Sequence, residues 1–317
     1  MTMINDQRIA VVVPCYNEST QILRVLQTMP AEVDRVYVID DASPDDTAAV
    51  VRAYQPCDPR IELLVHPVNQ GVGGAIASGY KAALAERMDV TVVMAGDGQM
   101  DPTDFPAIVE PVLSGHYDYA KGNRLFSGEA WNMIPRVRYL GNAMLSLLTK
   151  IASGYWHIAD SQSGYTAISL HGLEAINWDL MYKRYGQPND LLVRLNIADM
   201  RVTDVPIRPV YGIGEKSGIR PLRMIPQLSW LIFRLFFYRL LHKYVIQDFH
   251  PLVFFYAFGL TLFPPGFVFG IYLLGLRLFF GPIAGTSAMF ATLLTLMGLQ
   301  FLLFAMLFDQ EQNKHLK

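Results

Sequence analysis

The sequence predicts an α/β domain with a mostly parallel sheet, followed by an amphipathic helix and a hairpin of two membrane-spanning helices. Three observations predict this fold class. Short runs of β-branched residues alternate with helix-like runs over the first two thirds of the 317-residue chain. Polar residues follow directly after each of the first four predicted strands, where open α/β sheets place their ligands. Two long stretches without charge lie in the last third.

The predicted elements follow one another in a β–α order. Runs of β-branched and apolar residues predict strands at 8–13, 36–39, 61–65, 90–94 and 117–121. The capping side chains of Asn17 and Ser19 open the first helix, and Pro44 lies near the first turn of the second. Four residues, 71–74, lead into a third helix at 75–87. This order implies a mostly parallel sheet with helices on both faces.

The most informative stretch is VVMAGDGQMDPTD, residues 92–104. The strand stops at Ala95, and Asp97, Gln99 and Asp101 follow at once. Carboxylate and amide oxygens are the ligands that a hard divalent cation prefers, with further ligands from substrate phosphates and water. The alternative interpretation is an Asx-rich turn that caps the next helix.

Three other strand ends carry the same kinds of residue: Pro14 to Glu18, Asp40 with Asp41, and His66 to Asn69. Four such ends in register predict a shared crevice at the carboxyl edge of the sheet. The glycine-rich run GVGGA at 71–75 lacks both the P-loop lysine and the dinucleotide glycine spacing, which excludes those two sites.

Charge and hydropathy separate the chain into two kinds of region. The formal net charge of −2 gives no global signature of a nucleic-acid-binding protein. Residues 252–276 and 283–308 contain no charged side chain, and each is about 25 residues long, whereas a spanning helix needs roughly 20. Pro264-Pro265 predicts a kink in the first span, and Gly281-Pro282 predicts the turn between the spans.

Flanking charges predict the orientation in the membrane. Basic residues precede the first span and follow the second, whereas the loop between the spans offers only Arg277; the flanking residues are Arg220, Arg223, Arg234, Arg239, Lys243, Lys314 and Lys317. The positive-inside rule therefore places both flanks in the cytoplasm, in a multi-pass protein of the cell (inner or plasma) membrane. The N-terminal apolar run is too short for a signal peptide. Cys15 and Cys57 have no metal spacing, and a cytoplasmic location argues against a disulfide.

Four regions are therefore expected. Residues 1–218 form the cytoplasmic domain and 219–246 form juxtamembrane helices. Residues 247–310 hold the two spans, and 311–317 form a cytoplasmic tail. The aromatic and basic run within 224–245 suits a helix lying in the membrane interface, and the alternative is an ordinary amphipathic packing helix.

Four motifs in this order, VVVPCYNE, VIDDASPDDT, NQGVGGAIASG and GDGQMDP, resemble those of inverting family-2 glycosyltransferases, which have the Rossmann-like GT-A nucleotide-sugar fold. The resemblance covers about residues 8–218. The two spans make the chain similar to the branch that contains dolichyl-phosphate mannose synthase and bacterial polyprenyl-phosphate glycosyltransferases.

The resemblance implies roles for the residues at the strand ends. The nucleotide sugar is expected to contact Pro14, Tyr16, Glu18, Asp40, Asp41, Asn69 and Gly71. Asp97 and Gln99 are expected to hold Mg²⁺ or Mn²⁺ on the diphosphate, with Asp97 counted among the catalytic residues. Ala95 stands where relatives usually carry another acid, which weakens the metal site or transfers the role to Asp101 or water. Turn capping is the alternative role for Asp40 and Asn69.

Later segments concern the acceptor. KGNRLF resembles the family's GSR stretch, so Arg124 is expected to bind phosphate and to take part in catalysis. ADSQSGYTAI resembles a segment in which arginine often occupies the position of Thr166, and its task then falls to Arg136, Arg138 or Lys121. GQPNDLL places Asn189 and the candidate catalytic Asp190 where relatives carry an acid. YGIGEKSG resembles a closing loop, in which Glu215 and Lys216 form either an acceptor-binding lid or an exposed turn.

The implied activity is transfer of one sugar from a UDP- or GDP-linked donor to a polyprenyl phosphate, undecaprenyl or dolichyl, in cell-envelope synthesis. A lipid phosphate is already anionic and needs positioning more than deprotonation. A hydroxyl acceptor, on another lipid or a glycan, would need Asp190 or Asp160 as base. A catalytically silent membrane scaffold is the alternative from another class. The expected partners are the donor, the lipid acceptor, the membrane and further copies in a tetrameric homo-oligomer, without nucleic acid. The sequence does not name the sugar or the base.

Overall fold

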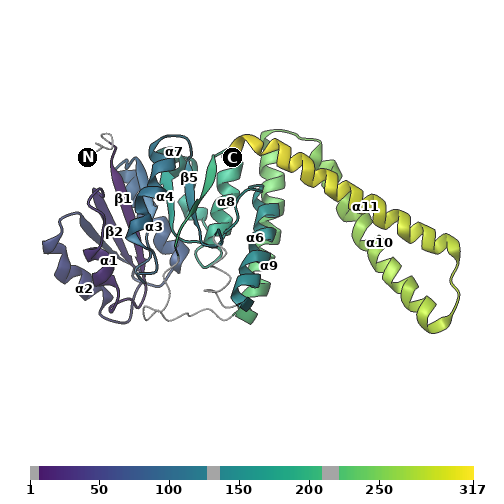
Figure 1. The fold of residues 1–317 in the computed structure, drawn as a ribbon, viewed down its shortest axis with the longest axis horizontal. Coiled ribbons are helices and arrows are strands. Elements are labelled where there is room, and N and C mark those ends of the chain that lie inside the picture. Colours follow the sequence, from purple (N-terminus) through teal and green to yellow (C-terminus); the bar gives the residue numbers. More distant parts are fainter. Residues whose placement is uncertain (1–6, 127–135, 209–220) are drawn as a thin grey trace. The chain divides into compact units, whose positions relative to one another are not determined.

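The computed structural model describes residues 7–126, 136–208 and 221–317, except for the side chains of 136–140, 142 and 221–223. The chain separates into two compact units (Figure 1). The first comprises residues 1–236 together with Leu316 and Lys317, and the second comprises residues 237–315.

The first unit contains a seven-stranded sheet in the order β3-β2-β1-β4-β6-β5-β7. Its strands are β1 (Ile9–Cys15), β2 (Arg35–Asp40), β3 (Ile61–Val65), β4 (Val90–Val93), β5 (Tyr119–Asn123), β6 (Thr166–Ser169) and β7 (Val202–Pro206). Only β6 runs antiparallel to its neighbours within this sheet. The predicted mostly parallel α/β fold is therefore confirmed.

The central strands are apolar because helices cover both of their faces. All seven residues of β1 are buried, and so are all four of β4. A strand covered on both faces reads as a continuous apolar run rather than as an alternation. The α-helices with described bounds that lie wholly within this unit are α1 (Ile22–Gln27), α2 (Thr47–Tyr54), α3 (Val72–Ala85), α4 (Phe105–Leu113), α6 (Arg136–Ser153), α7 (Leu170–Ala175) and α8 (Gln187–Ile197).

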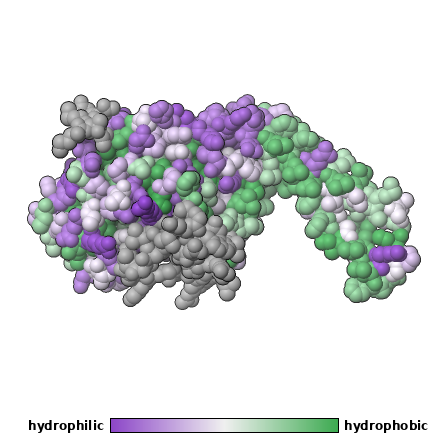
Figure 2. Space-filling model, viewed as in Figure 1, coloured by the Kyte–Doolittle hydropathy of each residue, from purple (hydrophilic) through white to green (hydrophobic). Residues whose placement is uncertain are grey.

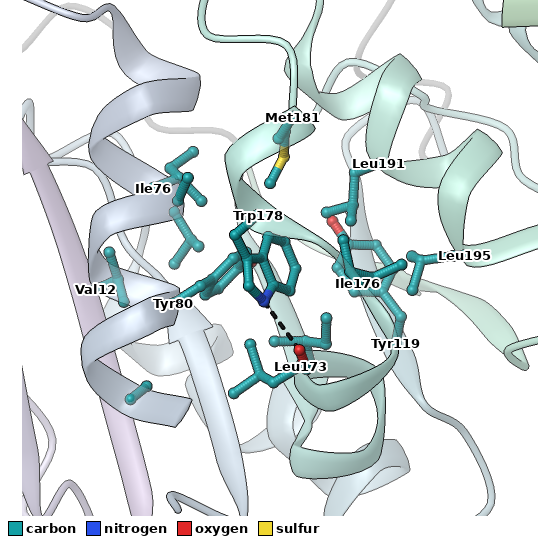
Figure 3. Packing of buried hydrophobic residues seen from close by; sticks show 14 of the residues in the cluster. Val12, Ile76, Tyr80, Tyr119, Leu173, Ile176, Trp178, Met181, Leu191 and Leu195 are labelled. Carbon is teal, nitrogen blue, oxygen red and sulfur yellow. Dashed lines mark hydrogen bonds between the residues drawn. The ribbon is translucent and has the colours of Figure 1, made fainter. Parts of the chain in front are cut away.

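Two hydrophobic cores lie on opposite faces of the sheet. The core on one face includes side chains of α1, α2 and α4. On the other, residues of α3, α7 and α8 surround Trp178 (Figure 3). The Trp178 indole N–H donates to the Leu173 carbonyl at 2.9 Å, and its ring lies 4.7 Å from that of Tyr80. Leu316, which follows both predicted spans in sequence, is fully buried in this second core.

The second unit contains two long antiparallel helices, α10 (Leu252–Phe280) and α11 (Gly285–Gln312), both long and apolar enough to cross a membrane. Most of their residues carry hydrophobic colouring in Figure 2. Glycines allow the two backbones to approach closely: a Cβ on Gly298 would lie 2.3 Å from the Phe263 nitrogen, and one on Gly266 would lie 2.7 Å from Leu294 Cβ. The predicted pair of spans therefore packs as a hairpin.

Helix α9 (Pro221–Leu241) contains the boundary between the units and continues into a π-helical turn, His242–Gln247. Its exposed apolar side chains recur every three or four residues, at Trp230, Phe233, Phe237 and Leu241. Within the second unit, Arg239 and Asp309 are both fully buried and form a two-bond ion pair of 2.7 and 3.0 Å.

Candidate active site

Parallel pairing brings the predicted site residues to one edge of the sheet. Strands β1 to β5 all end at this edge, and the loop before β6 joins them because β6 runs the other way. The neighbours of β1 are β2 and β4, so the chain leaves β1 toward one side and returns on the other. Such a reversal of strand order is the usual place for a ligand in an open α/β sheet.

Gly96 allows the loop after β4 to close against the end of β1. Its N–H donates to the Pro14 carbonyl at 3.2 Å, and a Cβ at this position would lie only 2.6 Å from Cys15 Sγ. A larger residue would therefore displace the loop. The glycine holds Asp97 close to the residues that follow β1.

The oxygens after β4 divide between two roles. One oxygen of Asp101 accepts from the Thr103 N–H at 2.9 Å and so caps a short 3₁₀ turn, Pro102–Asp104. The cap matches the turn interpretation for Asp101. Asp97 accepts from the Gln99 N–H at 2.9 Å. Among the described residues, no three His, Cys, Asp or Glu side chains are grouped as a metal site. A cation at Asp97 and Gln99 would therefore take most of its ligands from diphosphate oxygens and water.

The pKa of Glu18 shows that the end of β1 lies in an acidic environment. Burial, followed by the charges of Asp97 and Asp45, raises the pKa of Glu18 to about 7. The contribution of these charges shows that the three acids lie close together. The donor set and its potential fit a divalent metal ion carried in with a diphosphate.

The loop after β2 holds the loop after β1. Thr47 Oγ1 accepts from the Glu18 N–H at 2.9 Å, and Asp45 accepts from the Ser19 N–H at 3.1 Å. The Asp45 carboxylate also accepts from the Thr47 hydroxyl at 2.5 Å. Backbone rather than side-chain contacts thus fix Glu18, whose carboxylate is left for the site. The side chain of Tyr16 remains about half exposed.

Asp41 is buried, and its carboxylate organises the loop after β3. It accepts from the N–H groups of Gln70 and Gly71 at 2.8 and 2.7 Å. It also lies 2.7 Å from His66 Nδ1, and the other ring nitrogen of His66 lies 2.9 Å from the Ser78 hydroxyl. The Asn69 side chain donates to the Asp41 carbonyl at 3.1 Å. Asp41 therefore shapes the edge that Asn69 and Gly71 belong to.

Asp40 differs from Asp41 in its hydrogen bonding. It is 2% exposed, and its Oδ1 has no hydrogen-bond partner among the residues that the structure describes. Leaving a buried carboxylate oxygen without a donor costs free energy, and such atoms occur where a ligand supplies the donor.

The glycines at the start of α3 serve close packing. Gly71 has φ +88°, and a Cβ on it would lie 2.5 Å from the Lys183 carbonyl; one on Gly73 would lie 2.3 Å from the Tyr182 carbonyl. The Gly74 N–H donates to the same Lys183 carbonyl at 3.1 Å. Side chains here would push the 182–183 segment off the helix.

Arg124, which follows β5, and Asp160, which precedes β6, form an ion pair at the same edge of the sheet. Arg124 Nε lies 2.7 Å from Asp160 Oδ2, and its NH2 lies 3.2 Å from Oδ1. The carboxylate is fully buried, whereas the arginine side chain retains 20% exposure. The charge of Arg124, ahead of that of Lys121, holds the pKa of Asp160 low despite its burial. The guanidinium is thus fixed where it emerges at the edge of the sheet.

Asp190 and Asn189 lie buried at the first turn of α8. Asp190 Oδ2 accepts from the Tyr182 N–H at 2.7 Å and from Arg194 Nε at 3.0 Å. Asn189 Oδ1 accepts from Thr149 Oγ1 at 2.9 Å and from Gln162 Nε2 at 2.8 Å. These bonds tie the helix to the loops around it. The proposed catalytic role of Asp190 stays a prediction.

Three predicted acceptor contacts lie outside this description. Lys216, with Glu215, belongs to the undescribed segment, and the side chains of Arg136 and Arg138 at the start of α6 are undescribed too.

Sequence reasoning placed His66 among the strand-end residues of the crevice, without its bond to Asp41, and offered Lys121 as an acceptor-phosphate contact, whereas Lys121 is fully buried. It gave no role to Asp204. The β7 sequence VTDVP places Asp204 in register with Lys121, but that signal appears only once β5 and β7 are known to pair.

Comparison with known proteins agrees with this architecture. A family model described as Glycosyl transferase family 2 matches residues 10–176. The chain is 30% identical over 217 residues to an undecaprenyl-phosphate mannosyltransferase of Micrococcus luteus, covering 67% of this chain and 88% of that protein. It is 27% identical over 219 residues to a UDP-N-acetylglucosamine–dolichyl-phosphate N-acetylglucosaminyltransferase of Methanococcus voltae, covering 65% and 87%.

Among solved structures, the chain resembles glucosyl-3-phosphoglycerate synthase from Mycobacterium tuberculosis in complex with Mn²⁺, UDP and phosphoglyceric acid. The TM-score is 0.55 at 21% identity, covering 74% of this chain and 78% of that one. The similarity establishes the GT-A fold. By its sequence, its fold and the family model that spans more than half of it, the chain belongs to glycosyl transferase family 2 and is a glycosyltransferase.

Proposed function

We propose that the protein transfers a sugar, with inversion, from a UDP- or GDP-linked donor to a polyprenyl phosphate. One observation carries this proposal: a single sheet edge bears an acidic part, at Glu18 and Asp97, and a cationic part, at Arg124. The acidic part suits a diphosphate that arrives with a metal ion, and the cationic part suits an anionic acceptor. Relatives named for transfer to dolichyl phosphate and undecaprenyl phosphate support the same acceptor class.

The donor would lie over the ends of β1, β2 and β4. Asp40 Oδ1 would accept a hydrogen bond from the base or ribose, since it has no donor among the described residues. Tyr16 offers an exposed ring beside it. Asp97 and Gln99 would hold Mg²⁺ or Mn²⁺, which supplies positive charge to the departing diphosphate. The charge of the ion would also favour the ionised form of Glu18.

The acceptor would reach Arg124 from the exposed side of its pair with Asp160. An arginine fork positions phosphate oxygens well. A phosphate needs no base, and the two acids considered as bases are engaged already. Asp160 accepts from Arg124 and from the Gln162 N–H, and Asp190 accepts from Arg194. The geometry therefore favours a phosphate over a hydroxyl acceptor.

The membrane would deliver the acceptor. The hairpin of α10 and α11 suits two spans, and the apolar stripe of α9 suits the interface. The basic residues outside the spans favour a catalytic unit on the cytoplasmic side.

The test uses the full chain in detergent or nanodiscs. Mn²⁺ or Mg²⁺ is supplied with a panel of UDP- and GDP-sugars, and polyprenyl phosphate is compared with the matching polyprenol. We expect a sugar-phosphate-lipid, identified by mass, and no product from the alcohol. Equal or better use of polyprenol, or of a glycan, would overturn the phosphate-acceptor proposal.

A further inference from the structure

A second pair of charged residues, Lys121 and Asp204, lies in one row across the sheet. Lys121 on β5 pairs in register with Thr166 on β6 and with Asp204 on β7. Residues in register point to the same face of a sheet. Lys121 is completely buried, which is rare for a lysine unless its charge is paired.

Lys121 has one hydrogen-bond acceptor and several charged neighbours. Its ammonium donates to the Ser163 carbonyl, in the loop before β6. The charges of Asp160 and Asp204 favour its protonated form, and that of Arg124 opposes it. Burial is the largest effect and lowers the pKa of Lys121 to about 8. The hydrogen bond to the Ser163 carbonyl and the two acids act against burial and favour the ammonium form.

Asp204 is the acid least satisfied by hydrogen bonds in this row. Its Oδ2 accepts from the Ala159 N–H at 2.5 Å and from Asn123 Nδ2 at 3.2 Å. Its Oδ1 is buried without a hydrogen-bond partner among the described residues. Burial raises the pKa of Asp204 to about 6. The nearby cation that favours its charge is Lys121.

These residues form a balanced set of two cations, Lys121 and Arg124, and two acids, Asp160 and Asp204. The side chain of Arg124 is 20% exposed and Asp204 is partly buried, whereas Lys121 and Asp160 are fully buried. Without Lys121, the remaining three groups would carry one net negative charge. Charge interactions are strong where water is largely excluded.

We propose that Lys121 is a positioning residue for the acceptor phosphate, because it offsets the charge of Asp204, the partly buried acid in register with it near Arg124. The inference rests on the proposed function, in which Arg124 meets a phosphate. Lys121 does not touch the acceptor. It removes a negative charge that would otherwise repel the phosphate and draw the guanidinium inward.

A purely structural role for Lys121 predicts a different result from a role in charge balance. If Lys121 served only to hold the Ser163 carbonyl, its loss would disturb the 160–164 loop whatever the charge of Asp204. If it serves charge balance, neutralising Asp204 at the same time would repair its loss.

The experiment compares wild type with Lys121→Met, Asp204→Asn and the double variant, all as full-length protein. Lys81→Met, on the half-exposed side of α3, is the matched control. The KM for polyprenyl phosphate, the Kd for UDP or GDP with Mn²⁺ and the thermal midpoint are measured in each.

We expect Lys121→Met to raise the acceptor KM about tenfold or more, the size of one poorly screened charge interaction, with an unchanged nucleotide Kd. The double variant should return the KM to within about threefold of wild type, because the charge balance is restored. Asp204→Asn alone should lower the KM or leave it unchanged. Lys81→Met should resemble wild type.

An unchanged KM in folded Lys121→Met, or a double variant as impaired as the single one, would overturn the proposal. If Lys121→Met does not fold, a higher acceptor KM in Asp204→Asn would overturn it, and a lower one would support it. Wild type that uses polyprenol but not polyprenyl phosphate would refute the proposed function itself. Wild-type activity on the phosphate with a failed rescue would refute only the role of Lys121.

Discussion

The two parts of the carboxyl edge handle charge in opposite ways. At the ends of β1, β2 and β4, burial and the charges of Asp97 and Asp45 raise the pKa of Glu18, and a buried oxygen of Asp40 has no donor among the described residues. At the ends of β5 and β7, Lys121 and Arg124 lie among Asp160 and Asp204, and the opposite charges favour the ionised forms. The acidic part suits a positively charged ligand, and the mixed part suits an anion. The proposed function assigns the donor to the first part and the acceptor to the second.

The largest effect is expected at the acidic part. Asp97→Ala should lower the turnover number by at least about 10²–10³, because the metal-bound diphosphate loses a ligand where leaving-group charge develops. Circular dichroism should show an unchanged fold. Asp101→Asn, which keeps an oxygen to cap the Thr103 N–H, is the matched control and should retain most of the activity. Full turnover of Asp97→Ala at saturating Mn²⁺ and Mg²⁺ would place the metal elsewhere.

The next effect concerns the mixed part. Arg124→Lys keeps the charge beside Asp160 but loses the planar fork, so kcat/KM for polyprenyl phosphate should fall by about 10- to 100-fold. Nucleotide affinity, measured by calorimetry, should stay the same. A parallel loss of nucleotide affinity would show that the two parts are one site, and would contradict the comparison.

Asp41→Ala should affect donor binding through the loop after β3. Its carboxylate accepts from two loop N–H groups and bonds His66, so the loop would lose its anchor. The KM for the nucleotide sugar should rise about tenfold while kcat changes less, since these contacts do not alter during the reaction. His66→Gln, which disturbs one of the same contacts, should have a smaller effect. Unaltered nucleotide affinity would remove this loop from the donor site.

The smallest effect is a pH dependence. Because the pKa of Glu18 is raised to about 7, the group is mostly neutral at pH 6 and mostly ionised at pH 8. A bound cation favours the ionised form, so Mn²⁺–UDP affinity should increase from pH 6 to pH 8. Glu18→Gln should flatten this change. Titration calorimetry in buffers of different ionisation enthalpy would detect the released proton, and an affinity that falls over this range would show that Glu18 does not feel the metal.

The sequence was sufficient for the fold class, the family and the sheet edge, because periodicity and strand-end residues are local signals. The five predicted strands all occur. The third, 61–65, is exact, and the ends of the others differ by at most two residues: the fifth was expected at 117–121 and is Tyr119–Asn123. Helix α3 begins at Val72 rather than at 75 because the glycines form its first turn.

The hydrogen-bond and ion-pair partners of the site side chains could not be predicted from the sequence. The pairing of Arg124 with Asp160, and the register of Lys121 with Thr166 and Asp204, depend on how distant strands meet. The pattern identified Thr166 as a departure but could not show that a cation stands directly opposite it. Likewise, Asp41 was assigned to the nucleoside, whereas its carboxylate is directed to the loop of His66 and Gly71. The predicted roles at these positions remain to be tested by the variants above.

The burial of Leu316 in the core around Trp178 has a consequence for biogenesis. This leucine is synthesised after both long apolar helices. The core around Trp178 therefore cannot complete its packing until both long helices have been synthesised and the last residues have left the ribosome. The last step in folding of the first unit is thus post-translational.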